Sequence, residues 1–352
     1  MFKIYKMPVK ILFVGDPHFQ VSNIPEVDIF IEKLEKLAKN ENPDLICVGG
    51  DLLHTHERLH TIALNKAYEF IKKLRSISPT YILVGNHDYS NNSQFLTTNH
   101  WMNGMKEWDN TFVVDEVKCI ELKGEIFTFC PYVYPGRFEE ALNTVGSKWK
   151  ESSIIFAHQE FAGCKMGAII SIEGDKWPLD YPEVISGHIH SRQIPQKNIY
   201  YSGSAMQHAF GESEKNIIPV IVTSGKFDKY FLNEVDLELS RKKIVYLDVN
   251  TIDEYVPPVT EDKIKVTLSG VYDEFKVFKK TAKYKDLIDK GVKVVFKPKK
   301  HKKQDEDVVL EDTNFRDVLY GIVSAQKDSF LYEVYELIVN NKKIDEDDIM
   351  FL

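Results

Sequence analysis

The amino-acid sequence predicts an α/β protein whose main part is a two-sheet β-sandwich flanked by helices. In the first part of the chain, continuous apolar runs alternate with amphipathic stretches of helical periodicity. Further along, short apolar runs follow one another with turn residues between them. Five of the apolar runs end in an aspartate, asparagine or histidine. Since the carboxyl ends of parallel strands meet at one edge of a sheet, these polar ends predict a common site.

A β-α-β-α-β series is expected at the beginning of the sandwich. Its strands are predicted at 10–16, 44–51 and 81–86, and its helices at 24–39 and 60–75. Each helix has one apolar face at helical spacing, formed by Val27, Phe30, Ile31 and Leu34 in the first and by Ala63, Ala67, Phe70, Ile71 and Leu74 in the second. This order predicts parallel strands joined by right-handed crossovers.

The middle of the chain is expected to complete the sandwich with strands of mixed direction. Residues 90–110 are polar and rich in asparagine, which predicts a surface excursion with the character of a lid. Further strands are predicted at 111–114, 118–122, 126–132, 153–157, 183–186, 199–204, 217–224 and 227–235.

The composition changes after about residue 240, so the domain prediction is 1–240 for the sandwich and 241–297 for a small α+β unit. Residues 298–311 form a charged linker, and residues 312–352 form two amphipathic helices. Their apolar faces carry Phe315, Val318, Leu319, Ile322 and Val323 in the first and Leu331, Val334, Tyr335 and Ile338 in the second. Such short helices behind a linker have no evident core of their own, which favours a folded partner as their binding surface.

Composition and charge limit the class of protein. The net charge of -8 excludes a basic nucleic-acid coat, although a local phosphate site neutralised by cations remains compatible with it. The four cysteines (Cys47, Cys119, Cys130 and Cys164) lie in or beside apolar runs, which favours reduced thiols. The sequence shows neither a signal peptide nor a long apolar run, so we expect a soluble intracellular protein, cytoplasmic or, in a eukaryotic host, nuclear.

The polar strand ends supply a set of candidate metal ligands made of two aspartates, one asparagine and four histidines. They are Asp16, His18, Asp51, Asn86, His158, His188 and His190. Oxygen and imidazole donors without thiolate favour Mn²⁺, with Fe²⁺ or Zn²⁺ also suited, over Ca²⁺ or structural zinc. Asp51 has two carboxylate oxygens and can bridge two cations. A pair of divalent ions about 4 Å apart stabilises both oxygens of an in-line phosphoryl displacement, which predicts a phosphoesterase.

These residues also have a structural interpretation. A single histidine near a strand end is more often a hydrogen-bonded structural residue, and Gly-Asn-His alone is a weak signal. The ordered series Asp-x-His, Gly-Asp, Gly-Asn-His-Asp, His and Gly-His-x-His is far more specific, because each member closes an apolar strand. His87 is left over from the ligand set, and we expect it to protonate the leaving alkoxide as a general acid.

The chain resembles the calcineurin-like metallophosphoesterases and, within them, the SbcD-type nuclease subunit of DNA double-strand break repair. The broad resemblance rests on the ordered series above. The narrower one rests on Gly50-Asp51-Leu52-Leu53-His54, where Leu53 replaces the family's usual aromatic residue, and on the segments 201–207 and 210–212. The resemblance is clear over about residues 8–235 and only architectural beyond them.

The resemblance implies a metallophosphoesterase fold and assigns the site residues. One Mn²⁺ would be held by Asp16, His18, Asp51 and His190, and the other by Asp51, Asn86, His158 and His188; Mg²⁺ is a further candidate for either position. His87 would act at the scissile phosphate, and His54 would help to place the phosphate for exonucleolytic cutting.

The resemblance also implies the activity and the partners. It indicates a Mn²⁺-dependent DNA nuclease with 3′–5′ exonuclease and single-strand endonuclease activity. Residues 241–297 would be the capping domain, and residues 312–352 would bind the coiled-coil base of an SbcC-type ATPase. A homodimer is expected through helices of the phosphoesterase domain, with the helix at 60–75 as a candidate, and no membrane association is expected.

Two other functions remain open at this point. One is a small-molecule phosphodiesterase or protein phosphatase on the same fold, which would need neither the α+β unit nor the terminal helices. The other is a scaffold that mainly bridges DNA ends or anchors the ATPase, against which the complete ligand set argues. Among the remaining polar residues, His56 and His60 are interpreted as surface or helix-start residues, and His208 as hydrogen-bonded by default. Arg58, Lys165 and Arg192 are candidate DNA contacts only.

Overall fold

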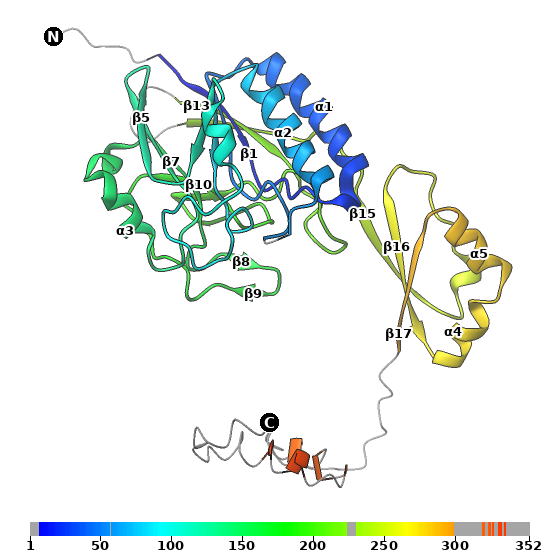
Figure 1. The fold of residues 1–352 in the computed structure, drawn as a ribbon. Coiled ribbons are helices and arrows are strands. Elements are labelled where there is room, and N and C mark those ends of the chain that lie inside the picture. Colours follow the sequence, from blue (N-terminus) through cyan, green and yellow to red (C-terminus); the bar gives the residue numbers. More distant parts are fainter. Residues whose placement is uncertain are drawn as a thin grey trace. The chain divides into compact units, whose positions relative to one another are not determined.

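A computed structural model describes residues 7–56, 58–223 and 230–298, together with short stretches between residues 319 and 335. The chain divides into two compact units, Met1–Pro298 and Lys299–Leu352 (Figure 1). Within the described residues, every helix is too short or too polar to cross a membrane.

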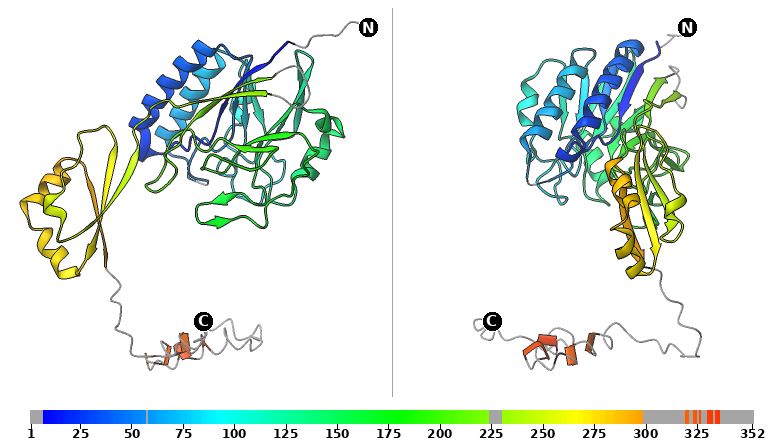
Figure 2. Two further views of the ribbon diagram at one scale, coloured as in Figure 1. Left: turned by 180° about the vertical axis from the view of Figure 1, so that it is seen from behind. Right: turned by 90° about the vertical axis from the view of Figure 1, so that its right-hand side faces the viewer.

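The first sheet of the sandwich has six strands in the order β14-β13-β1-β2-β3-β4. Its bounds are β1 Lys10–Val14, β2 Leu45–Val48, β3 Thr80–Leu83, β4 Thr111–Val114, β13 Ile218–Thr223 and β14 Tyr230–Val235. Strands β1 to β4 are parallel, whereas β13 and β14 are antiparallel additions. Helices α1 (Ile24–Glu41) and α2 (Thr61–Arg75) lie side by side on one face (Figure 2). The predicted β-α-β-α-β series is therefore present.

The second sheet also has six strands, in the order β11-β12-β10-β7-β6-β5. Its bounds are β5 Lys118–Leu122, β6 Glu125–Cys130, β7 Ile154–His158, β10 Glu183–Gly187, β11 Gln193–Gln196 and β12 Ile199–Tyr201. Strands β6, β7, β10 and β12 are parallel. Helix α3 (Phe138–Leu142) and the buried Trp149 cover its outer face.

The two sheets pack through alternate side chains of their buried strands. Phe13 of β1 and Phe129 of β6 both contact Phe156 of β7, with ring centroids 5.9 and 5.3 Å apart. The neighbouring residues Leu12 and Val14 point to the other face of the first sheet, where they pack with α1 and α2. Because both faces of β1 are buried, its sequence is a continuous apolar run. The predicted fold class, a mixed α/β protein with two sheets flanked by helices, is confirmed.

The segment at 90–110 differs from the predicted lid in its second half. Met102 and Met105 are fully buried in the core beside α1 and α2, and Trp101 donates a hydrogen bond from Nε1 to the buried Asp88. The burial of two methionines and a tryptophan contact outweighs the polar composition, so this half is anchored to the core. Residues 91–93 are exposed, as expected for a surface loop.

A third, three-stranded parallel sheet follows the sandwich and matches the predicted α+β unit in composition and order. It consists of β15 (Lys242–Asp248), β16 (Lys263–Gly270) and β17 (Lys293–Pro298). Helices α4 (Tyr272–Phe278) and α5 (Ala282–Asp289) pack on one of its faces and share a core with it. The boundary near residue 240 stays a prediction, because the three sheets belong to one compact unit.

The predicted linker and terminal helices lie mostly outside the described residues. In the described part of the second unit, helical residues occur at 319–320, 323–324, 330–332 and 334–335. The ring of Tyr320 packs against the rings of Tyr332 and Tyr335, with centroids 6.0 and 5.8 Å apart. These contacts place two helical stretches against each other.

Candidate metal centre

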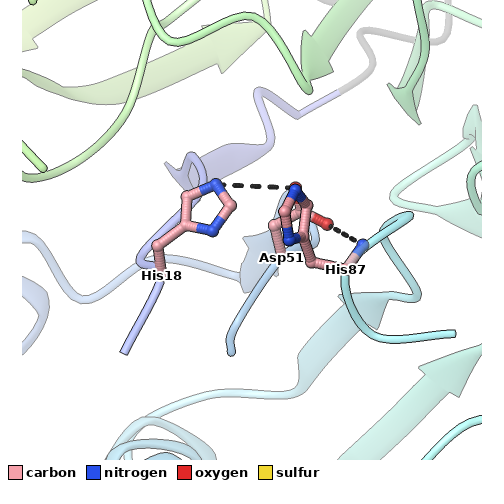
Figure 3. Close-up of side chains that lie close together, drawn as sticks. All are labelled: His18, Asp51 and His87. Atoms are coloured by element: carbon pink, nitrogen blue, oxygen red, sulfur yellow. Dashed lines mark hydrogen bonds and ion pairs between the residues drawn. The ribbon is translucent and has the colours of Figure 1, made fainter. Parts of the chain in front are cut away.

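The carboxylate of Asp51 lies at the centre of the candidate site. Asp51 is buried behind the end of β2, and its Oδ2 lies 3.5 Å from His18 Nε2 and 3.4 Å from His158 Nε2. His18 comes from the first sheet and His158 from the second, so one carboxylate faces imidazoles of both sheets. Its other oxygen, Oδ1, accepts a hydrogen bond of 2.8 Å from the backbone N–H of His87 (Figure 3). This position is the one that a bridging ligand needs.

Three candidate ligands gather on the His18 side of Asp51. His18 Nε2 and His190 Nε2 lie 2.9 Å apart. At this spacing, at most one of the two nitrogens carries a proton. Asp16 is fully buried, and within the described residues its Oδ2 has no hydrogen-bond partner. A buried carboxylate oxygen without a partner is costly. Two imidazole nitrogens beside such an oxygen can serve as ligands of a cation.

The other side of Asp51 is formed by Asn86, His158 and His188. Asn86 Oδ1 lies 3.0 Å from His158 Nε2 and 2.9 Å from His188 Nδ1. His158 donates a hydrogen bond of 2.6 Å from Nδ1 to the carbonyl of Gly49, which leaves its Nε2 to face the site. An amide oxygen and two imidazole nitrogens thus converge on one point, as in a divalent-cation site.

The structure therefore brings all seven predicted ligands together, and their binding of metal stays a prediction. Within the described residues, two triads place their ligand atoms within 4.8 Å of one another, His18–Asp51–His87 and Asp51–His158–His188. They share Asp51, as a two-metal arrangement requires. His87, which is outside the predicted ligand set, belongs to the first triad and lies beside Asp51 (Figure 3). Its predicted role as an acid stays a prediction as well.

Four of the candidate ligands have a left-handed backbone conformation. The φ angles of Asp16, His18, Asp51 and His188 are 35°, 46°, 51° and 78°. Such angles cost about 1–3 kcal/mol for each residue other than glycine, and they cluster at functional sites. The chain bends sharply at the strand ends, and this turns the polar side chains toward one another.

Close packing of backbone against side chain explains one glycine of the site. A Cβ on Gly85 would lie 2.2 Å from Asp51 Oδ1, so any larger residue would displace the central carboxylate. Asp88 closes the same turn, because its side chain accepts hydrogen bonds from the backbone N–H groups of Gly85 and Leu52. The Asp88 of Gly-Asn-His-Asp thus holds the β3 turn against the β2 turn. The sequence series contained this residue without indicating its role.

The segment at 201–212 supports the site from the backbone side. Ala205 donates its N–H to the Gly15 carbonyl, and Ser204 donates to the His190 carbonyl. The ring of His208 lies 2.9 Å from the Asp16 carbonyl through Nε2, in agreement with its expected hydrogen-bonding role. These contacts fix the chain on both sides of the His18–His190 pair.

Glu212 is a supporting residue whose role the sequence analysis did not identify. Its Oε1 lies 3.3 Å from His190 Nδ1, and its Oε2 accepts hydrogen bonds from the N–H groups of His208 and Ala209. A carboxylate can only accept, so His190 carries its proton on Nδ1 and presents Nε2 to His18. The only signal in the sequence was the position of Glu212 in the Phe-Gly-Glu segment.

Burial and charge divide the ionisable groups of the site into two kinds. Burial lowers the pKa of His18 well below its usual value and that of His188 to about 3, so both rings are neutral with free lone pairs. Burial raises the pKa of Asp16 to about 6. For His158, burial alone would lower the pKa, but the charge of Asp51 outweighs it and raises the pKa to about 9. The metal-free site therefore holds a proton where a cation would sit.

The other predicted residues have varied surroundings. The ring of His54 lies near the rings of His18 and His87, at centroid distances of 5.3 and 5.8 Å. His60 begins α2 and caps it by accepting from the N–H of Ile62, as expected for a helix-start residue. Arg192 forms an ion pair of 2.7 Å with Glu234, which occupies it within the protein.

Comparison with known proteins identifies relatives of this architecture. The family model for the calcineurin-like phosphoesterases matches residues 9–192. The chain is 52% identical over 276 residues to "Putative phosphoesterase 244L" of Invertebrate iridescent virus 6, which is 77% of this chain and 97% of that protein. It is 46% identical over 332 residues to "Putative phosphoesterase 078R" of Invertebrate iridescent virus 3, covering 92% of this chain and 94% of that protein.

We predict that the affinity of the site for Mn²⁺ rises with pH between about 6.5 and 8.5. The proton on His158 must leave before a cation binds, and its pKa of about 9 keeps it in place over this range. Each pH unit should strengthen apparent binding up to about tenfold, with release of at least one proton. Calorimetry in two buffers of different ionisation enthalpy measures both quantities. An affinity that does not change with pH would contradict the assignment.

We predict that Glu212→Gln weakens Mn²⁺ binding by about 10–100-fold, because His190 loses the acceptor that orients its ring. Calorimetric titration of the purified variant measures the affinity, and its thermal unfolding shows whether the fold is kept. Glu214→Gln is the matched control, since Glu214 is exposed two residues away. Equal affinities for the Glu212 and Glu214 variants would rule out this positioning role.

Proposed function

The chain belongs to the calcineurin-like phosphoesterases and is a metal-dependent phosphoesterase, and we propose that its substrate is DNA. In this proposal it is a Mn²⁺-dependent nuclease, with 3′–5′ exonuclease and single-strand endonuclease activity, in an SbcCD-type complex. The observation that carries the proposal is the basic face of the third sheet opposite α4 and α5, which follows the phosphoesterase sandwich.

Helices α4 and α5 cover one face of the third sheet, and the opposite face is partly exposed, with Lys265 on it lying over the ring of Phe210. The covered face packs against α4 and α5 through Ile264, Val266 and Leu268 of β16. Side chains alternate along a strand, so Lys265 of β16 and Lys293 and Lys297 of β17 belong to the opposite face. A phosphoesterase for small substrates has no need of such an added basic surface.

The register of the strands places lysines and an aromatic ring in adjacent rows of this face. Lys265 pairs with Lys293 in one row, and Tyr246 pairs with Thr267 in the next. The side chain of Tyr246 is 68% exposed. Lysines that attract phosphates beside a ring on which a base can stack are the two parts of a surface for single-stranded nucleic acid.

The candidate metal centre would supply the chemistry of cleavage. We propose that Asp16, His18, Asp51 and His190 hold one divalent cation, and that Asp51, Asn86, His158 and His188 hold the other. When bound, such a pair stabilises the negative charge of an in-line phosphoryl displacement.

We propose that His87 acts on the leaving oxygen. Its Nδ1 lies 2.8 Å from the carbonyl of His54, which can only accept, so Nδ1 carries a proton. Nε2 lies on the other side of the ring and, in this proposal, carries the second proton of the imidazolium, although burial lowers the pKa of His87. Transfer of that proton to the leaving alkoxide neutralises the oxygen as its bond to phosphorus breaks. His54 thereby also positions His87 through its backbone.

We propose that residues 312–352 bind an SbcC-type ATPase. We also propose a homodimer, formed through helices of the phosphoesterase domain. In the described part of this segment, Phe330 and Leu331 are 55% and 43% exposed beside the tyrosine cluster of Tyr320, Tyr332 and Tyr335. Exposed apolar side chains on short helices support a partner surface.

We predict that the protein degrades single-stranded DNA with Mn²⁺ and that Asp51→Ala abolishes both cleavage and metal binding. His87→Ser should abolish cleavage and keep the metal, because it removes a proton donor and no ligand. Lys293→Glu with Lys297→Glu should raise the KM for DNA about tenfold and lower its salt dependence. Cleavage of labelled oligonucleotides, with calorimetric metal binding, measures these effects.

The matched control for the sheet face is Lys280→Glu with Lys285→Glu, which reverses the same number of charges on exposed positions near α4 and α5. This variant should cleave DNA like the wild type. Hydrolysis of bis(p-nitrophenyl) phosphate should be equal in the wild type and in both double variants. Turnover of small phosphodiesters or phosphopeptides without any cleavage of DNA would overturn the proposal.

A further inference from the structure

A groove of about 710 Å³ opens beside the candidate metal centre. It lies between two loops, the one that follows β2 and the one that follows β3, and both loops carry site residues. His56 and Arg58 line it from the first loop, and Ser90 and Asn92 line it from the second. Its volume is in the range of sites for small ligands, about 300–1,000 Å³. None of the seven candidate metal ligands lines this groove.

The rings of three histidines connect the groove to the site. The ring of His56 is stacked on that of His87, with centroids 4.4 Å apart and planes 18° apart. The ring of His54 is also nearly parallel to that of His87, at 5.8 Å and 16°. His87 is only partly buried, and His56 is partly exposed next to the exposed Arg58. His87, which lies beside Asp51, is thus in ring contact with two residues that line the groove, His54 and His56.

The residues of the groove define the chemistry of its ligand. In the described part of its lining, hydroxyl and amide groups of Thr55, Ser90 and Asn92 supply donors and acceptors, Arg58 supplies a positive charge, and carboxylates do not occur. An aromatic ring with hydrogen-bonding groups around it suits a flat ligand with a polar edge. A nucleobase has this form, and every base offers a face for stacking.

We propose that this groove binds a nucleobase next to the scissile phosphodiester, with the ring of His56 as its stacking surface. The inference rests on the proposed function and adds a subsite to the same site. His87 is the proposed acid at the leaving oxygen, and the ring of His56 stacks on it at a centroid distance of 4.4 Å. The contact holds a strand in place without reading its sequence, because stacking tolerates all bases. Arg58 lines the same groove and supplies a positive charge for an adjoining phosphate.

The test compares His56→Ala with His56→Phe, which keeps an aromatic ring. The substrates are a single-stranded oligonucleotide and two copies with one tetrahydrofuran abasic residue, on either side of the scissile bond. His56→Ala should raise the KM for intact DNA about tenfold with little change in kcat. The variant should behave like the wild type on one of the two abasic substrates, and His56→Phe should restore the affinity.

Two controls separate stacking from support of His87. A further oligonucleotide with tetrahydrofuran residues on both sides of the scissile bond has no base there, so its cleavage should be the same in the wild type and in His56→Ala. His60→Ala changes a nearby histidine that lies outside the groove and should leave the KM for DNA unchanged. If His56→Ala slows cleavage of this doubly abasic substrate and of both singly abasic oligonucleotides as much as that of intact DNA, the subsite is excluded. An unchanged KM for intact DNA excludes it as well.

If the protein is a phosphoesterase but not a nuclease, the wild type hydrolyses bis(p-nitrophenyl) phosphate and leaves DNA intact. In that case the subsite is measured by inhibition of this hydrolysis with thymidine 5′-monophosphate and with deoxyribose 5-phosphate, which lacks the base. About tenfold stronger inhibition by the nucleotide in the wild type, and equal inhibition by both in His56→Ala, supports the subsite. Equal inhibition in the wild type overturns it.

Discussion

The carboxylate of Asp51 between His18 and His158 is the interaction on which the rest of the structure depends. These imidazoles come from different sheets, and each Nε2 lies within 3.5 Å of the same oxygen. The distance between the sheets must therefore be fixed, and the stacked rings of Phe13 and Phe156 between them serve this purpose. A well-packed core transmits strain rather than absorbing it, so the sandwich sets the geometry of the site.

The unfavourable burial and backbone angles of the site residues indicate their function. Asp16, His18, Asp51 and His158 are almost completely buried, and three of these four have left-handed backbone angles. Burying such groups is unfavourable unless they are compensated. In the metal-free protein, the ion pair between Asp51 and His158 compensates only part of the set, because Asp16 Oδ2 has no partner in the described structure. Divalent cations would satisfy the whole set at once.

The strand ends could be predicted from the sequence because each ligand directly follows a continuous apolar run. The two-residue spacing of Asp16 with His18 and of His188 with His190 was visible in the same way. The supporting contacts could not be predicted, because they join residues far apart in the chain, as Gly85 does with Asp51. Met102 and Met105 show the same limit, since a polar stretch gives no sign that two of its residues reach the core. The stacking of His56 on His87 depends on a loop conformation, and the sequence indicated only a surface residue.

The central claim is that the seven side chains hold two cations on either side of Asp51. The most direct measurement is anomalous diffraction at the manganese edge from crystals grown with Mn²⁺. We predict two peaks about 4 Å apart, with the Asp51 carboxylate between them, His18 and His190 at one peak and His158 and His188 at the other. A single peak, or two peaks that do not share Asp51, would contradict the account.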